Sequence, residues 1–123
     1  IKYSFLTALA AGTCAMRAPI GAIVAGEGGI DFMTALHEEC LAIAAASGQP
    51  VPAAAQAGAR DTLTAAGSPM KASMLRDLES GQRVEAAHIV GDMVHRAAAQ
   101  GISVPRLHAA WVHLQAYERL RTS

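Results

Sequence analysis

The sequence is poor in the features that mark several large classes of protein. Aromatic residues make up only 4% of its 123 residues, and it contains two cysteines. So few cysteines suggest neither a disulfide framework nor a cysteine-based metal cluster. Cys14 and Cys40 both lie in alanine-rich segments with helical patterns. We therefore expect buried, unreactive thiols at these two positions.

An excess of charge of either sign is also missing. Lys plus Arg equals Asp plus Glu at 10 each, which gives a formal net charge of zero. This balance argues against nucleic acid or an anionic membrane as a partner. Charges, prolines and glycines break every apolar stretch well before the ~20 residues that a bilayer crossing needs. The first residues do not show a signal-peptide pattern either, so we expect a soluble, cytoplasmic protein.

Alanine and aliphatic residues dominate what remains. Hydrophobic residues make up 52% of the chain, and a mixture so rich in alanine and poor in aromatics favours helices over strands. A chain of this length forms one domain with a genuine core. The fold class expected is therefore all-α, a single bundle of about six to seven helices. Ile1, Lys2 and Tyr3 run directly into a helical pattern, which indicates a piece of a longer protein.

Apolar residues recur at helical spacing along the whole chain. Ser68 is a possible N-cap and Pro69 a first-turn proline for one short helix. His37, Glu38 and Glu39 fall off the apolar stripe of their segment, and the residues before Pro105 form a short extended link. The segments predicted to be helical are Lys2 to about Arg17, Ile20 to Ala25, Phe32 to a stop at Gly48, Pro52 to about Ala66, Met70 to Ser80, Val84 to a stop at Gln100 and Gly101, and Leu107 to Tyr117 with a frayed end through Thr122.

The five histidines do not form a metal-binding pattern. His88 and His95 are seven residues apart, which on a helix is two turns or about 10 Å, too far for two rings to share one ion. His108 and His113 are five apart, and His37 stands alone. We expect surface or hydrogen-bonded histidines and no metal. The glycines from Gly26 to Gly29 lie between two helical segments, so they do not match a nucleotide-binding loop.

Three polar residues are candidates for chemistry: Lys2, Ser73 and Glu85. Each also has an ordinary interpretation. Lys2 fits a solvated lysine near a helix end, Ser73 an ordinary helix serine, and Glu85 an acid favoured by the dipole of a helix start. Taken one at a time, the ordinary interpretations are favoured.

The segment from Ser73 to Glu85 resembles the S-M-L-x-D-x-x-x-G-x-x-x-E segment of ketopantoate reductases. In this chain it reads S-M-L-R-D-L-E-S-G-Q-R-V-E. Ile89 and Gly91 also fit the pattern of that family, and G-I-S-V-P at residues 101–105 is similar to its link before the last helix. Lys2 stands where the family has its lysine, on the first long helix of the C-terminal domain. The resemblance covers essentially the whole chain.

The resemblance implies a helical C-terminal substrate-binding and dimerisation domain over residues 1–123, with the N-terminal Rossmann domain absent from this chain. It implies reduction of a 2-oxo acid by NADPH bound mainly by that other domain, a homodimer, and, for the closest relatives, a role in pantothenate biosynthesis. Lys2 is then the general acid, Glu85 the second catalytic polar group, and Ser73 a hydrogen-bonding residue for the substrate. An ammonium beside a ketone stabilises the negative charge that develops on the carbonyl oxygen and supplies the proton.

Two positions depart from the family. The members closest to the pantothenate enzyme carry asparagines four and eight residues after the lysine, where this chain has Leu6 and Ala10. Two lost amides change the substrate contacts more than the reaction type. The alternative is a helical dimerisation or interaction domain that kept the fold without the catalysis, and a chance match is a third interpretation. We expect the isolated chain to be inactive.

Overall fold

The computed structural model describes residues 2–84 and 87–122, and the side chains of residues 4–84 and 87–121. These residues form helices and no strand, as the composition predicts, so the all-α class with its seven helices is confirmed. The helices are α1 (Lys2–Met16), α2 (Ile20–Ala25), α3 (Gly29–Ala46), α4 (Ala53–Leu63), α5 (Ser73–Glu79), α6 (Ala87–Ala99) and α7 (Pro105–Thr122).

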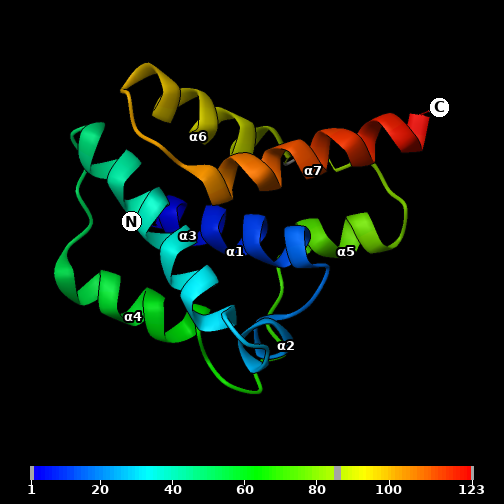
Figure 1. Cartoon of the computed structure of the whole chain (residues 1–123), viewed down its shortest axis with the longest axis horizontal. Coiled ribbons are helices and arrows are strands. Elements are labelled where there is room, and N and C mark those ends of the chain that lie inside the picture. Colours follow the sequence, from blue (N-terminus) through cyan, green and yellow to red (C-terminus); the bar gives the residue numbers. More distant parts are fainter. Residues whose placement is uncertain (1, 85–86, 123) are drawn as a thin grey trace.

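Helix α1 lies in the middle of the molecule. Figure 1 shows it between α6 and α7 on one side and α2 and α4 on the other, and it packs against α3, α5, α6 and α7. Its buried residues are mainly small, which lets the neighbouring helices approach closely. A Cβ built at Gly12 would lie 2.7 Å from the sulfur of Met33 on α3, so a larger residue at this position would force the end of the Met33 side chain to move.

The end of α1 is fixed by its backbone. Arg17 has a left-handed conformation with φ of 54°, and the next residue, Ala18, donates its N–H to the carbonyl of Thr13 at 3.2 Å. This arrangement is a Schellman-type helix end, which more often uses glycine. Pro19 then precedes α2, so the predicted break between the first two helices is confirmed.

The start of the short helix α5 differs from the prediction. We expected Pro69 in its first turn, but the helix begins at Ser73. The segment before it serves another helix. The carbonyls of Ser68 and Met70 accept the N–H groups of Gly21 at 2.8 Å and Ile20 at 2.9 Å. The first turn of α2 thus finds acceptors for N–H groups that have no partner within their own helix, and the extended segment cannot also be helical.

The beginning of α7 depends on a buried carboxylate from α3. Glu39 accepts the backbone N–H of Leu107 at 2.9 Å and that of Arg106 at 3.2 Å, and the guanidinium of Arg106 lies 3.4 Å away. Pro105, the first residue of α7, has no N–H to satisfy. The sequence placed Glu39 on the polar side of α3. Instead its side chain is only 8% exposed, because it caps another helix.

Helices α6 and α7 pack through an aromatic contact. A Cβ at Gly91 would lie 2.7 Å from the ring of Trp111, so this glycine is needed for packing. His95 meets the same ring edge-on, with centroids 6.3 Å apart, a favoured aromatic geometry. The structure thus gives a packing role to Gly91, one of the residues that match the family pattern.

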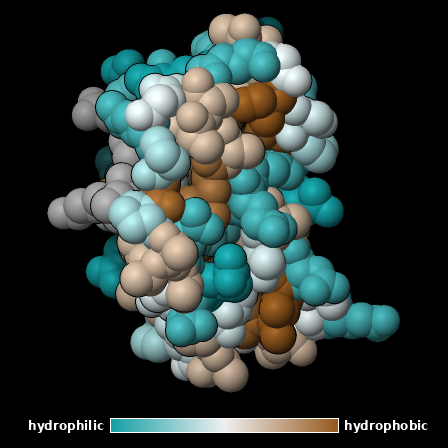
Figure 2. Space-filling view, turned by 90° about the vertical axis from the view of Figure 1, so that its left-hand side faces the viewer, coloured by the Kyte–Doolittle hydropathy of each residue, from teal (hydrophilic) through white to brown (hydrophobic). Residues whose placement is uncertain are grey.

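Two helix ends differ from the predicted ones. Helix α4 ends at Leu63, before the expected Ala66, and α7 continues to Thr122 without fraying at Glu118. No helix in the described part of the chain is long and apolar enough to cross a membrane. Figure 2 shows hydrophobic residues at separate places among hydrophilic ones on the side that it presents, and no continuous apolar face there.

Candidate active site

Two of the three predicted site residues lie largely outside the described residues. Lys2 begins α1, but its side chain is not among those described, and Glu85 lies between the two described ranges. Their roles, and the distances between the three functional groups, therefore stay predictions. Ser73 is fully described, and it is the first residue of α5 with an exposed side chain.

The start of α5 is anchored against α1. Met74, Leu75 and Leu78 are buried in the core, and the N–H of Ala72, just before Ser73, donates to the hydroxyl of Thr13 at 3.4 Å. This contact places the beginning of α5 beside Thr13 of α1. Thr13 is eleven residues after Lys2, which corresponds to about 16 Å along the axis of α1. Ser73 therefore lies exposed on the surface at the start of an anchored helix.

The face of α1 that follows Lys2 is aliphatic. Leu6, one turn after Lys2, is 46% exposed although most of α1 is buried, and Ala10, one turn further, is only 7% exposed. Residues four apart lie on the same side of a helix. Thr13 has a hydroxyl on this side, but it donates to the carbonyl of Leu9 at 2.7 Å. Among the residues named on this face, Leu6 is therefore the one that is exposed, and its side chain is aliphatic.

The polypeptide that leads to Glu85 is held by the last helix. The hydroxyl of Tyr117 donates to the carbonyl of Gln82 at 2.6 Å, and the carboxylate of Glu118 accepts the N–H of Val84 at 2.9 Å. The Val84 N–H, and then Arg121, lower the pKa of Glu118. Sequence reasoning missed both contacts, because Tyr117 was read as part of an apolar stripe and Glu118 as part of a frayed end.

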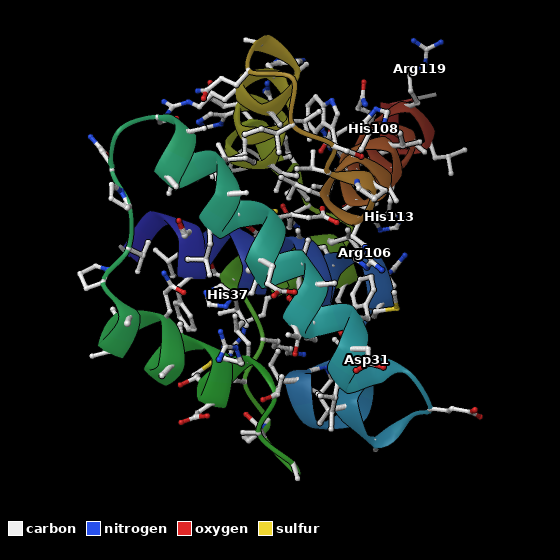
Figure 3. The ribbon with its side chains drawn as sticks, turned by 60° about the vertical axis from the view of Figure 1, so that its left-hand side comes forward. Asp31, His37, Arg106, His108, His113 and Arg119 are labelled. Atoms are coloured by element: carbon white, nitrogen blue, oxygen red, sulfur yellow. The ribbon has the colours of Figure 1, made fainter. Side chains whose placement is uncertain are left out.

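His37 and the two cysteines are buried. Figure 3 shows His37 between α3 and α4, and its side chain is 1% exposed. Its Nδ1 has no hydrogen-bond partner among the described residues, so the expectation of a surface or hydrogen-bonded histidine was wrong for this atom. Burial, and then the charge of Arg60, lower the pKa of His37. Cys14 and Cys40 are buried as predicted, and burial raises the pKa of both thiols to about 12.

The glycine-rich turn between α2 and α3 has a packing explanation. A Cβ at Gly29 would collide with the carbonyl of Ile23 on α2, and Gly28 has a left-handed φ of 82°. These glycines are needed because the chain turns tightly between two helices. The turn is not preceded by a strand, and a strand before the loop is part of the usual dinucleotide-binding arrangement. This turn therefore does not match that loop.

Comparison with solved structures defines the class of this fold. A PanE/ApbA family ketopantoate reductase from Ralstonia eutropha JMP134 matches with a TM-score of 0.84 and 29% identity over 99% of the chain. A 2-dehydropantoate 2-reductase from Methylococcus capsulatus matches with a TM-score of 0.80 and 23% identity over 99%. A ketopantoate reductase from Staphylococcus aureus, described as dimeric, matches with a TM-score of 0.80 and 20% identity over 97%. The fold is that of a helical domain of these reductases.

Sequence comparison then gives the family. The family model described as ketopantoate reductase PanE/ApbA C terminal matches residues 1–118, and the chain belongs to this family. A Bacillus subtilis (strain 168) protein named uncharacterized oxidoreductase YkpB is 33% identical over 117 residues, which is 95% of this chain. The chain spans 39% of the length of that relative and 41% of the R. eutropha protein.

Proposed function

We propose that this chain is the substrate-binding and catalytic helical domain of an NADPH-dependent 2-oxo acid reductase. A Rossmann domain elsewhere in the same protein would complete the enzyme. The observation that carries the proposal is the family match over residues 1–118, which includes the motif from Ser73 to Glu85. The extent of the matches supports the two-domain arrangement, since the chain corresponds to about two-fifths of each relative.

The chemistry divides among three residues of this chain. Lys2 is the general acid, because an ammonium next to the substrate ketone stabilises the developing alkoxide and protonates it. Glu85 orients that ammonium or accepts a hydrogen bond from the substrate. Ser73 donates a hydrogen bond to the substrate carboxylate. Its exposed position at the start of an anchored helix supports this role.

NADPH supplies the hydride in the proposed reaction. The residues described in this chain offer no glycine-rich loop between a strand and a helix, the usual site of a dinucleotide pyrophosphate. We therefore assign its binding mainly to the Rossmann domain. The helical domain then binds the substrate, and we expect the isolated chain not to oxidise NADPH with any 2-oxo acid.

The proposal extends to the 2-oxo acid class and not to ketopantoate in particular. Leu6 and Ala10 stand where the relatives closest to the pantothenate enzyme are expected to have amides. An exposed leucine one turn after Lys2 cannot hydrogen-bond a substrate hydroxyl, and sites that lose such partners change their selectivity strongly. The involvement of the protein in pantothenate biosynthesis, and its location in the cytoplasm, stay predictions.

We also propose that the protein is a homodimer. The S. aureus relative of the same fold is described as dimeric. Sedimentation of the full-length protein tests this, and a monomer at high concentration would contradict it.

The decisive experiment is an assay of the full-length protein with NADPH and a panel of 2-oxo acids. Lys2→Ala should lower kcat by about 100-fold or more, the contribution typical of a general acid. Arg96→Ala is a matched control, because it removes an exposed cation of α6 that pairs with Asp92, and it should leave kcat unchanged. A wild type without turnover, or turnover that survives Lys2→Ala, would instead favour a non-catalytic helical dimerisation or interaction domain.

A further inference from the structure

A cavity lies between α4 and the two helices α1 and α3. Its volume is about 390 Å³, within the range of roughly 300–1,000 Å³ that small-molecule sites occupy. The residues that α4 contributes are three and four positions apart, so they form one face of the helix, and their side chains are small. They are Ala55, Gly58, Ala59 and Thr62. Because these side chains are small, they leave open the space between α4 and the larger side chains opposite.

The opposite wall of the cavity is mainly apolar. It consists of Phe5 on α1, His37 and Leu41 on α3, and Val51 just before α4. Phe5 and Leu41 are half-buried and Val51 is buried. None of the described residues that line the cavity is an Asp, Glu, Lys or Arg. The lining therefore suits a neutral molecule with an apolar body.

His37 is the polar residue of this lining that lacks a partner. Its side chain is buried between α3 and α4 (Figure 3), and Nδ1 has no hydrogen-bond partner among the described residues. Burial, and then Arg60, lower the pKa of His37, which favours the neutral ring near pH 7. The hydroxyl of Thr62, in contrast, donates to the carbonyl of Gly58 at 3.1 Å. A buried polar atom without a partner destabilises a fold, so Nδ1 of His37 needs an explanation.

We propose that this cavity binds a small, neutral, aromatic molecule whose hydroxyl group pairs with Nδ1 of His37. A hydroxyl both donates and accepts hydrogen bonds, so it satisfies Nδ1 in either neutral tautomer of the ring. The aromatic body of the ligand packs against Phe5. The inference goes beyond the proposed function, because a 2-oxo acid is an anion and the described lining offers it no cation, which makes burial of its charge unfavourable.

Helix α4 is suited to admit such a ligand. Nδ1 of His37 is shielded from solvent, so the ligand reaches it only when α4 shifts. Leu63 is the one fully buried residue of α4, and the helix packs mainly against α3. Figure 1 shows α4 at the edge of the molecule, away from α6 and α7. Few buried contacts give a segment low local stability, so α4 can move while the rest of the core stays packed.

The test is an NMR titration of the full-length protein, labelled with ¹⁵N at histidine, with phenol and with toluene. Both should bind, and phenol should shift the Nδ1 resonance of His37 more than toluene, which has no hydroxyl. His37→Phe keeps a ring of similar shape without the nitrogen. It should raise the Kd of phenol by about three- to tenfold, the range for one lost hydrogen bond, and that of toluene by less than about twofold.

Substitutions on α4 locate the binding. Gly58→Leu places a large side chain where a Cβ meets nothing within 4 Å, so it should fill the cavity and raise both Kd values by more than about tenfold. Ala57→Leu is the matched control, because Ala57 is exposed on the same helix and does not line the cavity. It should change either Kd by less than about twofold. Benzoate, an anion of similar size, should bind at least about tenfold more weakly than phenol.

The contrary outcomes are equally specific. No binding of phenol, binding that survives Gly58→Leu, or equal effects of His37→Phe on phenol and toluene would each overturn the inference. Benzoate binding as tightly as phenol would do so as well. All of these results leave the reductase assignment intact, since none of them measures turnover. Circular dichroism checks that each variant is folded, and if His37→Phe does not fold, Gly58→Leu against Ala57→Leu still decides whether the cavity binds phenol.

Discussion

Removal of the Glu39 carboxylate should destabilise the domain more than most single substitutions. Two backbone N–H groups at the start of α7 depend on this side chain, at 2.9 and 3.2 Å. A hydrogen bond to a charged group contributes about 1.5–3 kcal/mol. The N–H of Leu107 is buried, whereas Arg106 is exposed and water can partly replace the carboxylate there. Glu39→Ala should therefore cost about 3 kcal/mol of unfolding free energy.

Glu39→Gln should cost less, about 1–2 kcal/mol, because its amide oxygen can still accept one of the two N–H groups. The assay is urea unfolding of this chain followed by far-UV circular dichroism, with the slope m compared between variants. Glu38→Ala is the control, since this neighbouring carboxylate is exposed and its loss should change stability by no more than ~0.5 kcal/mol. A cost below about 1 kcal/mol for Glu39→Ala would refute the capping argument.

Further predictions concern packing and ionisation. Gly91→Ala should lower the free energy of unfolding by about 1–3 kcal/mol, because the added methyl group would lie 2.7 Å from the Trp111 ring. Gly58→Ala should raise it by ~0.5–1 kcal/mol, because the space around Gly58 is open. Thermal unfolding measures both effects. The two cysteines, with pKa values raised to about 12, should react with a thiol reagent only after denaturation. Because the pKa of His37 is lowered in the folded state, the unfolded chain takes up the proton at a higher pH than the folded chain does. Stability should therefore fall as the pH drops below about 6.5, and it should fall less in His37→Gln.

The helices could be predicted because their signals are local. Apolar residues at helical spacing, with glycine or proline at the ends, gave α2 its observed bounds, Ile20–Ala25, and the ends of α3 and α6 to within a few residues. The start of α5 could not be found this way. Proline after a serine usually begins a helix, but Ser68 and Met70 are held by the first turn of α2, which lies almost fifty residues earlier.

The supporting contacts of the candidate site could not be predicted for the same reason. Glu39 was placed on a polar side because periodicity describes one helix at a time, whereas its partners are the N–H groups of another helix, at Arg106 and Leu107. Tyr117 and Glu118 likewise bind backbone atoms of a distant connection. Backbone groups are identical at every residue, so no sequence pattern marks which of them will need a partner.

Helix α1 separates the residues that pack in the core from a residue on its surface. Gly12 faces Met33 on α3, and a larger residue there would have to displace the end of the Met33 side chain. Leu6 lies six positions earlier, about 120° away around the helix, and is 46% exposed. Substitution at position 6 therefore alters a surface and not the core. Ala10, at 7% exposure, is more restricted. The residues that hold α1 in place thus differ from the exposed residue one turn after Lys2, so substitution at position 6 should change this surface with little effect on the packing of α1.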